Sequence, residues 1–326
     1  MDTELCLHLR GKKKTSWEQL LRQEGLTPDE RVEITCLIWD GETLVATGSR
    51  QENLLKCIAV NHAYQGQGLT ATLMTALRQD AQSQGYSHLF LYTKPKNELL
   101  FTPLFFSPVA QTEDILLMES VKNGIDGFLQ GLEKPTATGK IGCVVANCNP
   151  FTLGHRYLIE TAAKQCNLLY VFVLSEDKSA FSFADRLEMV KRGTEDLPNV
   201  VVLPTGPYLI SSATFPTYFL KDNAPAGTIQ CALDCRVFGS HYVPYFGIKT
   251  RFVGTEPNCR VTASYNETMK QILPQMGVEV VEIPRKTLED IPISASRVRE
   301  LLQTENWEEL KKLIPPTTYT YLKTIK

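Results

Sequence analysis

The residues best suited to chemistry lie in one short segment near the middle of the chain. Residues 149–155 read Asn-Pro-Phe-Thr-Leu-Gly-His and directly follow an apolar, strand-like run at 141–146. A helical pattern starts at once, which makes Thr152 the expected cap. A helix N-terminus offers unpaired N–H groups and a positive dipole end, and both attract phosphate. Gly154 lets backbone approach a ligand closely, and His155 can donate to a phosphate oxygen as charge builds there. The alternative is a solvated strand-to-helix turn.

A second segment has the same character. Residues 293–299 read Ile-Ser-Ala-Ser-Arg-Val-Arg and lead into another helical pattern. Ser294 is a good N-cap, and Arg299 falls one turn into the helix, on the side that reaches back toward the cap. With Ser296, this helix start would present hydroxyls, amides and a guanidinium to one anion. Taken alone, the segment also fits a plain capped surface helix.

The two segments together carry a resemblance to a known superfamily. They lie about 140 residues apart, which is within the size of one α/β domain. They resemble the paired signatures of the HxGH nucleotidyltransferase superfamily, written (H/T)-x-G-H and I-S-x-[ST]-x-x-R. The resemblance implies a site that binds nucleotide phosphates.

A few other residues are weaker candidates for the same site. Arg186 and Lys178 precede or open the next helical pattern, where each fits either a phosphate contact or a solvated helix face. Gly254 and Glu256 follow a strand and should lie near the nucleotide, although Glu256 fits a polar structural role equally well. Asp234 gains no role from the sequence.

The elements that must position these residues alternate between strand and helix. Strands are expected at 141–146, 168–174, 200–203, 251–254 and 278–283, and helices at 154–166, 184–193, 262–273 and 295–303. This alternation predicts a parallel, Rossmann-like sheet with helices on both faces. Ligands of such sheets bind beyond the carboxyl ends of the strands, where residues 149–155 would lie.

The first third of the chain has a different pattern. Residues 31–38 and 43–48 resemble a hairpin with 39–42 at the turn, and a strand at 54–60, a glycine-rich turn, a helix and a strand at 89–92 follow. This order is similar to the GNAT acetyltransferase fold, an α+β domain whose signature [QR]-x-x-G-x-[GA] binds the pyrophosphate of acyl-CoA. The turn reads Gln65-Gly66-Gln67-Gly68-Leu69-Thr70, with Thr70 in place of Gly or Ala, where a larger side chain would crowd a pyrophosphate.

Bulk properties exclude several classes of protein. The chain has 326 residues, enough for two domains, and a net charge of −2 gives no broad electrostatic surface for nucleic acid. Its nine cysteines lack zinc-ligand spacing and suit reduced thiols, so we expect no protein-bound metal site. No apolar run approaches the length of a membrane span and no signal peptide is apparent, which predicts a cytoplasmic protein without membrane contact. Gly and Pro residues mark 123–139 as a linker between domains at 1–122 and 140–326.

The combination of a GNAT-like domain with the two phosphate-binding segments resembles the citrate lyase ligase family. The resemblance extends to residues 181–186, 251–257 and 262–266 and so covers essentially the whole chain. It implies an ATP-dependent ligase that activates acetate as acetyl-AMP. The acetyl group then passes to the thiol of a coenzyme-A-like prosthetic group on the acyl carrier subunit of citrate lyase. AMP and pyrophosphate are released, and the lyase becomes active.

This reaction assigns roles to the candidate residues. His155 and Thr152 would contact the α- and β-phosphates, with Gly154 giving access, while Ser294, Ser296 and Arg299 would hold the β- and γ-phosphates that Mg²⁺ bridges. The remaining nucleotide-site candidates are Asn149, Phe151, Arg186 and Gly254. The coenzyme-like group would meet Gln65, Gly66, Gly68 and Thr70, unless the GNAT-like domain is only a scaffold. The acetate pocket is not identified from the sequence.

Three other activities would use some of the same motifs or only one of the two domains. An adenylyltransferase of coenzyme synthesis would leave AMP on its product. A tRNA-acetate ligase has a similar turn but needs an RNA surface, which the net charge disfavours. An acetyl-CoA-dependent acetyltransferase would use the first domain alone for chemistry. A binding module without catalysis is the least favoured alternative.

Overall fold

The computed structural model describes residues 1–209, 215–220, 226–256 and 260–325. Pro257, the last residue of the segment 251–257 named above, and Cys259, one of the nine cysteines, lie outside this part. The chain folds into two compact units. The first contains Met1–Gly124 together with Pro216–Ile229, and the second contains Ile125–Phe215 and Gln230–Lys326. The segment 123–139, expected as a linker, includes the helix α4 (Gly124–Gln130), and residues 131–140 carry no helix or strand.

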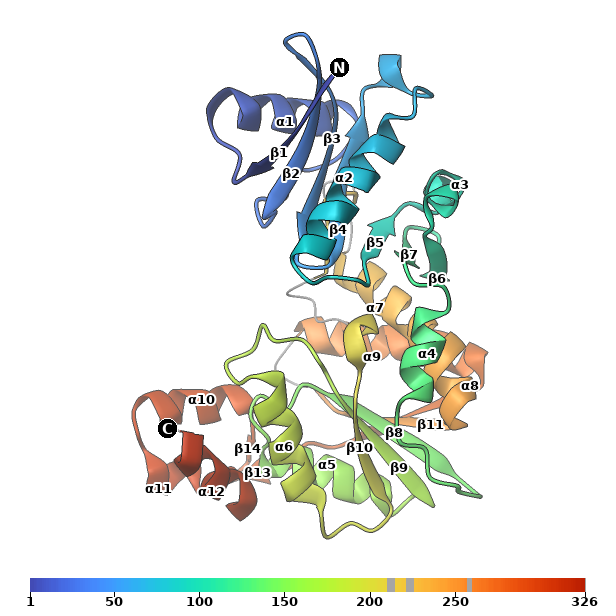
Figure 1. Ribbon diagram of the computed structural model, residues 1–326. Coiled ribbons are helices and arrows are strands. Elements are labelled where there is room, and N and C mark those ends of the chain that lie inside the picture. Colours follow the sequence, from blue (N-terminus) through green and yellow to red (C-terminus); the bar gives the residue numbers. More distant parts are fainter. Residues whose placement is uncertain (210–214, 221–225, 257–259, 326) are drawn as a thin grey trace. The chain divides into compact units, whose positions relative to one another are not determined.

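The first unit is built on a mixed sheet of seven strands (Figure 1). Its order is β1-β2-β3-β4-β5-β7-β6, and only the pairing of β4 with β5 is parallel. The strands are β1 (Asp2–Leu7), β2 (Ile34–Asp40), β3 (Thr43–Gln51), β4 (Leu54–Val60), β5 (Phe90–Thr93), β6 (Ser107–Gln111) and β7 (Leu116–Glu119). The helical segments are α1 (Gly11–Gln23), η1 (His62–Tyr64), α2 (Leu69–Ser83), η2 (Pro95–Asn97), α3 (Glu98–Phe101) and η3 (Thr102–Leu104).

The hairpin expected near residue 40 is present but tighter than predicted. Strand β2 continues through Asp40, which pairs with Thr43, so the turn consists of Gly41 and Glu42 alone. Gly41 has a φ of 60°, a conformation that glycine adopts without steric cost. The apolar face of α2 packs on the sheet through Leu73, Met74 and Leu77, as its helical spacing predicts.

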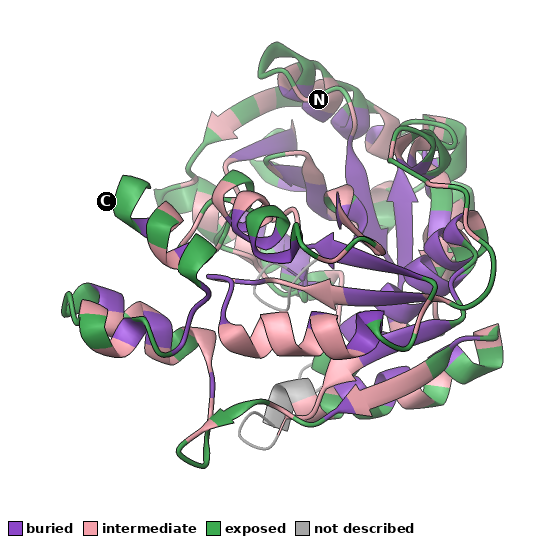
Figure 2. Ribbon diagram, turned by 90° about the horizontal axis from the view of Figure 1, so that it is seen from below, coloured by how far each residue is buried: buried purple, intermediate pink, exposed green. Residues whose placement is uncertain are grey.

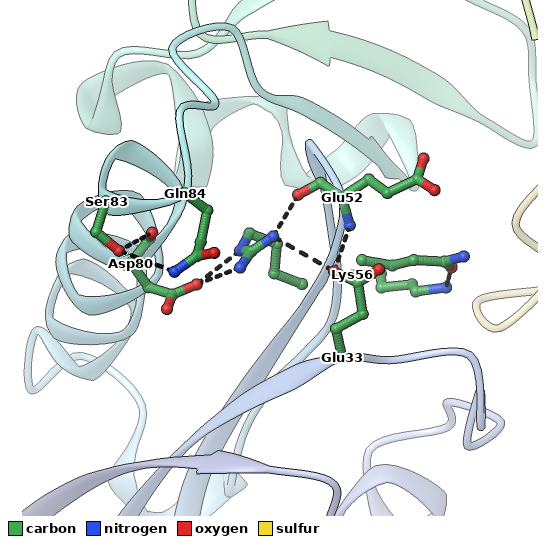
Figure 3. A network of polar contacts seen from close by, with 8 residues as sticks. Glu33, Glu52, Lys56, Asp80, Ser83 and Gln84 are labelled. Atoms are coloured by element: carbon green, nitrogen blue, oxygen red, sulfur yellow. Dashed lines mark hydrogen bonds and ion pairs between the residues drawn. The ribbon is translucent and has the colours of Figure 1, made fainter. Parts of the chain in front are cut away.

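A buried ion network holds the C-terminal end of α2 against β3. The Arg50 side chain is 4% exposed, and its guanidinium donates to Asp80 Oδ2 from Nε at 2.8 Å and to the Glu52 carbonyl at 2.7 Å. Glu33 lies 3.5 Å from the same guanidinium. Figure 3 labels three residues of this network: Asp80 of α2, Glu33 just before β2 and Glu52 just after β3. The network fixes the direction of α2 and therefore the place where its N-terminus opens.

The second unit contains an all-parallel five-stranded sheet, as the sequence predicts. Its order is β10-β9-β8-β11-β12, so the first strand along the chain stands in the centre. The strands are β8 (Ile141–Ala146), β9 (Leu168–Val173), β10 (Val200–Pro204), β11 (Thr250–Gly254) and β12 (Glu279–Ile283), with a small hairpin β13 (Thr287–Leu288) and β14 (Ile291–Pro292). The strand order changes direction at β8, and ligands bind at such a switch point.

Helices cover both faces of this sheet. Val144 and Phe252 point to a core shared with α5 (Leu153–Ala163), α6 (Phe183–Thr194) and α10 (Ala295–Gln303). On the opposite face, Tyr170 and Phe172 pack against aromatic rings of η5 (Phe238–Tyr242) and α8 (Val243–Phe246). The other helical segments are η4 (Gly206–Tyr208), α9 (Arg260–Ile272), η6 (Leu273–Met276), α11 (Trp307–Leu310), α12 (Pro316–Ile325) and α7 (Ala226–Val237), whose first residues, up to Ile229, belong to the first unit. In Figure 2 the inner strand β9 is buried throughout, the edge strands β10 and β12 are mostly of intermediate burial, and the helices alternate between buried and exposed residues.

Candidate nucleotide site

The first predicted segment forms the N-terminus of α5 immediately beyond the central strand. Thr152 is the N-cap, and its hydroxyl accepts a hydrogen bond from the His155 backbone N–H at 3.3 Å. The His155 side chain completes a capping box, because its Nδ1 accepts from the Thr152 backbone N–H at 3.1 Å. The helix start is therefore fixed by the two residues assigned to the phosphates.

These contacts also fix the protonation of His155. Burial, and then the positive charge of Arg285, lower the pKa of this imidazole to about 4, so it is neutral at physiological pH. Because Nδ1 accepts the Thr152 N–H, the single ring proton belongs on Nε2. His155 is thus a neutral donor whose Nε2–H is available to an acceptor such as a phosphate oxygen.

The second predicted segment forms the N-terminus of α10. Ser294 is its cap and accepts a hydrogen bond from the Arg297 backbone N–H at 3.2 Å. One turn later Arg299 reaches back, as its position predicts, and its Nη2 donates to Ser296 Oγ at 3.0 Å.

The structure brings the two segments together. Arg299 Nη1 donates to the Asn149 carbonyl at 2.6 Å, across a separation of 150 residues. A side-chain carbon at Gly154 would lie 3.2 Å from the Ile293 carbonyl oxygen, which is a tight contact, so glycine at this position helps the two backbones to approach closely. Two helix N-termini therefore open side by side at the carboxyl edge of the sheet.

One cation of this site was not among the residues singled out from the sequence. Arg285 follows the carboxyl end of β12, and its Nε donates to the Thr255 carbonyl at 2.8 Å. It forms an ion pair with Glu256, whose side chain is 7% exposed, and its charge acts on His155. Its place directly after a strand was the available signal, because all carboxyl ends of parallel strands meet at one edge.

Arg186 has a different position from the one expected of a phosphate contact. Its side chain is fully buried and makes five hydrogen bonds, to the Phe181, Asn147, Leu174 and Glu176 carbonyls and to the Asn147 side chain. It thereby ties the segment after β8 to the segment after β9, which contains Lys178. A contact of Arg186 with phosphate remains a prediction.

Two further candidates contribute through the backbone. Phe151 is fully buried and stacks on His155 with ring centroids 6.0 Å apart, so its side chain faces the core. Gly254 ends β11, and its carbonyl accepts from the Asn266 side chain at 3.0 Å. Both residues shape the edge of the site.

The glycine-rich turn of the first unit forms the N-terminus of α2. Gly66 and Gly68 have φ values of 81° and 77°, and a side-chain carbon at either would meet nothing within 4 Å. Gly68 is the N-cap, so no side chain caps the helix. Gln65 donates to the Val60 carbonyl at 3.3 Å, and Thr70 lies in the first turn. The turn leaves amide groups available to an anion.

The described residues contain neither a cluster of metal ligands nor a membrane-spanning helix. Within the ranges that the structure describes, no three His, Cys, Asp or Glu side chains are grouped as ligands of a metal ion. Over the same ranges, no helix combines the length and the hydropathy needed to cross a membrane. The eight cysteines described are all free thiols, six of them buried.

Comparison with known proteins agrees with both units. The model of the citrate lyase ligase C-terminal domain matches residues 141–322, and that of the acetyltransferase (GNAT) family matches residues 8–99. The chain is 40% identical over 322 residues to citrate (pro-3S)-lyase ligase of Escherichia coli K12, covering 97% of this chain and 92% of that protein. The Klebsiella pneumoniae protein of the same name is 41% identical over 311 residues, covering 94% and 91%.

A solved structure of Thermotoga maritima TmcAL, bound with alpha-thio ATP, is 15% identical and covers 57% of this chain and 55% of that one. The TM-score of that match is 0.34. The family match over the second unit and the near-complete alignment with named ligases together show that this chain belongs to the citrate lyase ligase family.

Proposed function

We propose that the chain is an ATP-dependent ligase that acetylates the coenzyme-A-like prosthetic group on the acyl carrier subunit of citrate lyase. The observation that carries the proposal is the junction of two capped helix N-termini, joined by the hydrogen bond from Arg299 to the Asn149 carbonyl. Such a junction suits a polyphosphate, which needs several donors in fixed positions. Membership of the citrate lyase ligase family supports the acyl carrier subunit of citrate lyase as the acceptor of the acetyl group.

The first step converts acetate into a reactive acyl donor. A carboxylate oxygen attacks the α-phosphorus of ATP, the new O–P bond forms, and the bond to the β-phosphate oxygen breaks. Pyrophosphate leaves with the electron pair, and acetyl-AMP remains. Charge accumulates on the α-phosphoryl oxygens and on the leaving pyrophosphate, so catalysis is mainly positioning and electrostatic stabilisation.

Different residues of the junction would contact different phosphates of ATP. His155 would donate from Nε2 to an α-phosphate oxygen, and the α5 N-terminus with Thr152 would hold the α- and β-phosphates. Arg299, Ser294 and Ser296 would hold the leaving pyrophosphate at the N-terminus of α10. Mg²⁺ would arrive bound to ATP and would offset part of the phosphate charge, while the donors named above would hold the phosphates.

The second step transfers the acetyl group to the carrier. The thiolate of the prosthetic group attacks the acetyl carbon, a C–S bond forms, the C–O bond to AMP breaks, and AMP leaves. The thioester on the carrier is the form that makes citrate lyase active.

Acetate-dependent exchange of pyrophosphate into ATP tests the first step. With Mg²⁺, we expect the wild-type protein to exchange only when acetate is present. His155→Ala should lower the rate by roughly 100- to 1000-fold, the loss typical of one preorganised donor to a developing charge. His8→Ala, which removes an exposed histidine of the first unit, is the matched control and should exchange like the wild type.

If the free enzyme gives no exchange, the carrier has to bind first, so the assay is repeated with deacetylated citrate lyase and AMP release is measured. Absence of AMP there would contradict the ligase activity. It would favour an adenylyltransferase of coenzyme synthesis, which keeps AMP on its product.

We also propose that the turn 65–70 takes the pyrophosphate of the prosthetic group. Support comes from the uncapped N-terminus of α2 and the open space around Gly66 and Gly68. Gly68→Arg would fill that space, and we expect it to raise the apparent KM for the carrier with the KM for ATP unchanged. Gly85→Arg places the same side chain after the other end of α2, at a glycine with equally open surroundings. An unchanged carrier KM in Gly68→Arg would leave this domain as a scaffold.

A further inference from the structure

The α-phosphate end of the proposed nucleotide site needs a positive charge that His155 does not supply. Attack on the α-phosphorus concentrates charge on the α-phosphoryl oxygens, whereas His155 is neutral at physiological pH. A charged donor stabilises such an oxygen more strongly than a neutral one. Arg299 is engaged at the N-terminus of α10, where pyrophosphate would be held. Another guanidinium at this edge of the sheet belongs to Arg285, two residues beyond the end of β12.

The side chain of Arg285 extends from β12 over the end of the neighbouring strand β11. Its backbone N–H donates to Thr255 Oγ1 at 3.2 Å, and its Nε donates to the Thr255 carbonyl at 2.8 Å. A side-chain carbon at Gly254 would lie 4.0 Å from Arg285 Cγ, so the hydrocarbon stem passes beside the last residue of β11. Because β11 lies between β12 and β8, the guanidinium is on the side of β12 that faces β8, the strand leading into α5.

Backbone contacts connect the same segment to the start of α5. The carbonyl of Lys286, the residue after Arg285, accepts a hydrogen bond from the Ile293 N–H at 3.0 Å. The Ile293 carbonyl oxygen in turn makes the close approach to Gly154, which immediately precedes His155. Two successive backbone contacts therefore bring Arg285 near the N-terminus of α5. In agreement with this placement, its positive charge adds to burial in lowering the pKa of His155.

One side of the Arg285 guanidinium is held by the protein and another is available. Nη2 forms an ion pair with Glu256, whose side chain is 7% exposed. Among the described residues none accepts a hydrogen bond from Nη1, and 31% of the Arg285 side chain is exposed. A guanidinium fixed in this way is preorganised for an anion, because little side-chain entropy remains to be lost on binding.

Building on the proposed ligase activity, we propose that Arg285 binds the α-phosphate of ATP together with His155, and that Glu256 positions the Arg285 guanidinium for this contact. Arg285 would supply the positive charge and His155 the neutral N–H to the same phosphoryl group. As the carboxylate oxygen attacks and pyrophosphate leaves, the hydrogen bond from Nη1 strengthens with the charge on the phosphoryl oxygen.

The two arginines of the site would then hold different parts of the nucleotide. Arg299 holds the pyrophosphate that departs in the first step, and Arg285 holds the phosphate that stays in acetyl-AMP. The same contact serves the second step, because the electron pair of the breaking C–O bond passes to an oxygen of the α-phosphate as AMP leaves.

The test measures the binding of AMP and of pyrophosphate separately, by titration calorimetry with Mg²⁺ present. AMP contains the α-phosphate, whereas pyrophosphate represents the leaving group. We expect Arg285→Met to weaken AMP binding by about 10- to 100-fold, the usual worth of a hydrogen bond between charged groups, with pyrophosphate binding unchanged. Arg285→Lys should fall between the wild type and Arg285→Met. Arg236→Met removes an exposed arginine of α7 and should bind both ligands like the wild type.

Two outcomes would overturn the proposal. A loss of pyrophosphate binding as large as the loss of AMP binding would not fit a contact with the α-phosphate. Unchanged binding of both ligands would leave Arg285 with a structural role alone. If Arg285→Met does not fold because Glu256 loses its ion pair, the double variant Arg285→Met with Glu256→Gln takes its place, since it removes both charges.

Two further readouts separate this role from a merely structural one. In the exchange assay, Arg285→Met should lower kcat by roughly 100- to 1000-fold, and Glu256→Gln should lower it less, because the amide still accepts a hydrogen bond from the guanidinium. NMR titration should show a higher pKa for His155 in Arg285→Met and no change in Arg236→Met; an unchanged pKa in both would contradict the placement of Arg285.

Lack of acetate-dependent turnover in the wild type, with carrier present, would instead contradict the ligase activity. The binding and NMR comparisons do not require turnover, so the two failures are distinguishable.

Discussion

At the scale of one residue, the buried carboxyl group of Asp234 should make the free energy of unfolding depend on pH. Its pKa in the folded protein is about 7, above the unfolded value near 4, so the folded state holds a proton that the unfolded chain releases. The stabilisation from that proton is complete below about pH 4 and is lost as the pH rises through 7. We therefore expect the free energy of unfolding to fall between about pH 5 and 8.

Asp234→Asn should flatten this pH dependence, because the amide keeps an acceptor for Tyr265 and does not ionise. Urea unfolding of both proteins across the same pH range measures the difference. Asp196→Asn is the control, since Arg156 holds the pKa of that exposed carboxyl below its usual value and its effect falls at lower pH. A parallel decline in the wild type and Asp234→Asn would assign the pH dependence to other groups.

At the scale of the element, the packing of α6 against residues 149–155 depends on a glycine, Gly193, which has no side chain. A side-chain carbon at Gly193 would overlap the Phe151 ring, which lies fully buried just before the α5 cap. Gly193→Ala should therefore destabilise the protein by about 1–3 kcal/mol, the usual cost of overpacking a core. It should also weaken ATP binding, because Phe151 precedes Thr152 and His155.

Gly227→Ala is the matched control for this substitution. Gly227 lies in α7, and a side-chain carbon there would meet nothing within 4 Å. Alanine has the higher helix propensity, so this variant should be as stable as the wild type or gain up to about 1 kcal/mol. Urea unfolding separates the two variants, and equal stabilities would show that the core yields to Gly193→Ala without cost.

At the scale of the whole molecule, the chain order and the two units do not coincide. Residues Pro216–Ile229 belong to the first unit although they follow β10 in the chain. The Tyr218 hydroxyl donates to the Tyr92 carbonyl of β5 at 2.7 Å, and the Thr27 N–H donates to the Tyr218 carbonyl at 2.7 Å. A segment from the second half of the sequence thus completes the first unit near β5.

Paired tyrosine variants test this exchange of chain between units. Tyr218→Phe removes the hydroxyl that donates to the Tyr92 carbonyl, and we expect faster hydrogen exchange at β4 and β5 with β8 and β11 unchanged. Tyr242→Phe removes the hydroxyl that donates to the buried Thr205 carbonyl, and it should give the reverse pattern. Identical exchange patterns in both variants would contradict the assignment of Tyr218 to the first unit.

Local sequence determined much of the architecture. The caps Thr152 and Ser294 and the glycine turn at 65–68 depend on contacts within a few residues, which spacing and residue type specify. The alternation of strand and helix likewise predicted the parallel sheet. The sequence pattern predicted no helix over the segment that forms α7, η5 and α8. Helices that are buried over much of their surface lack the polar stripe by which an amphipathic helix is recognised.

Only the tertiary structure decided how distant residues combine. Arg299 reaches Asn149 across 150 residues, and Tyr218 reaches Tyr92 across 126, and no local pattern encodes either pairing. The environment of Asp234 is likewise set by two helices that meet only in the fold, because Tyr265 of α9 donates to this carboxyl group on α7. Burial and charge depend on every neighbour in space, so the phosphate segments were predictable from sequence, whereas the surroundings of Asp234 were not.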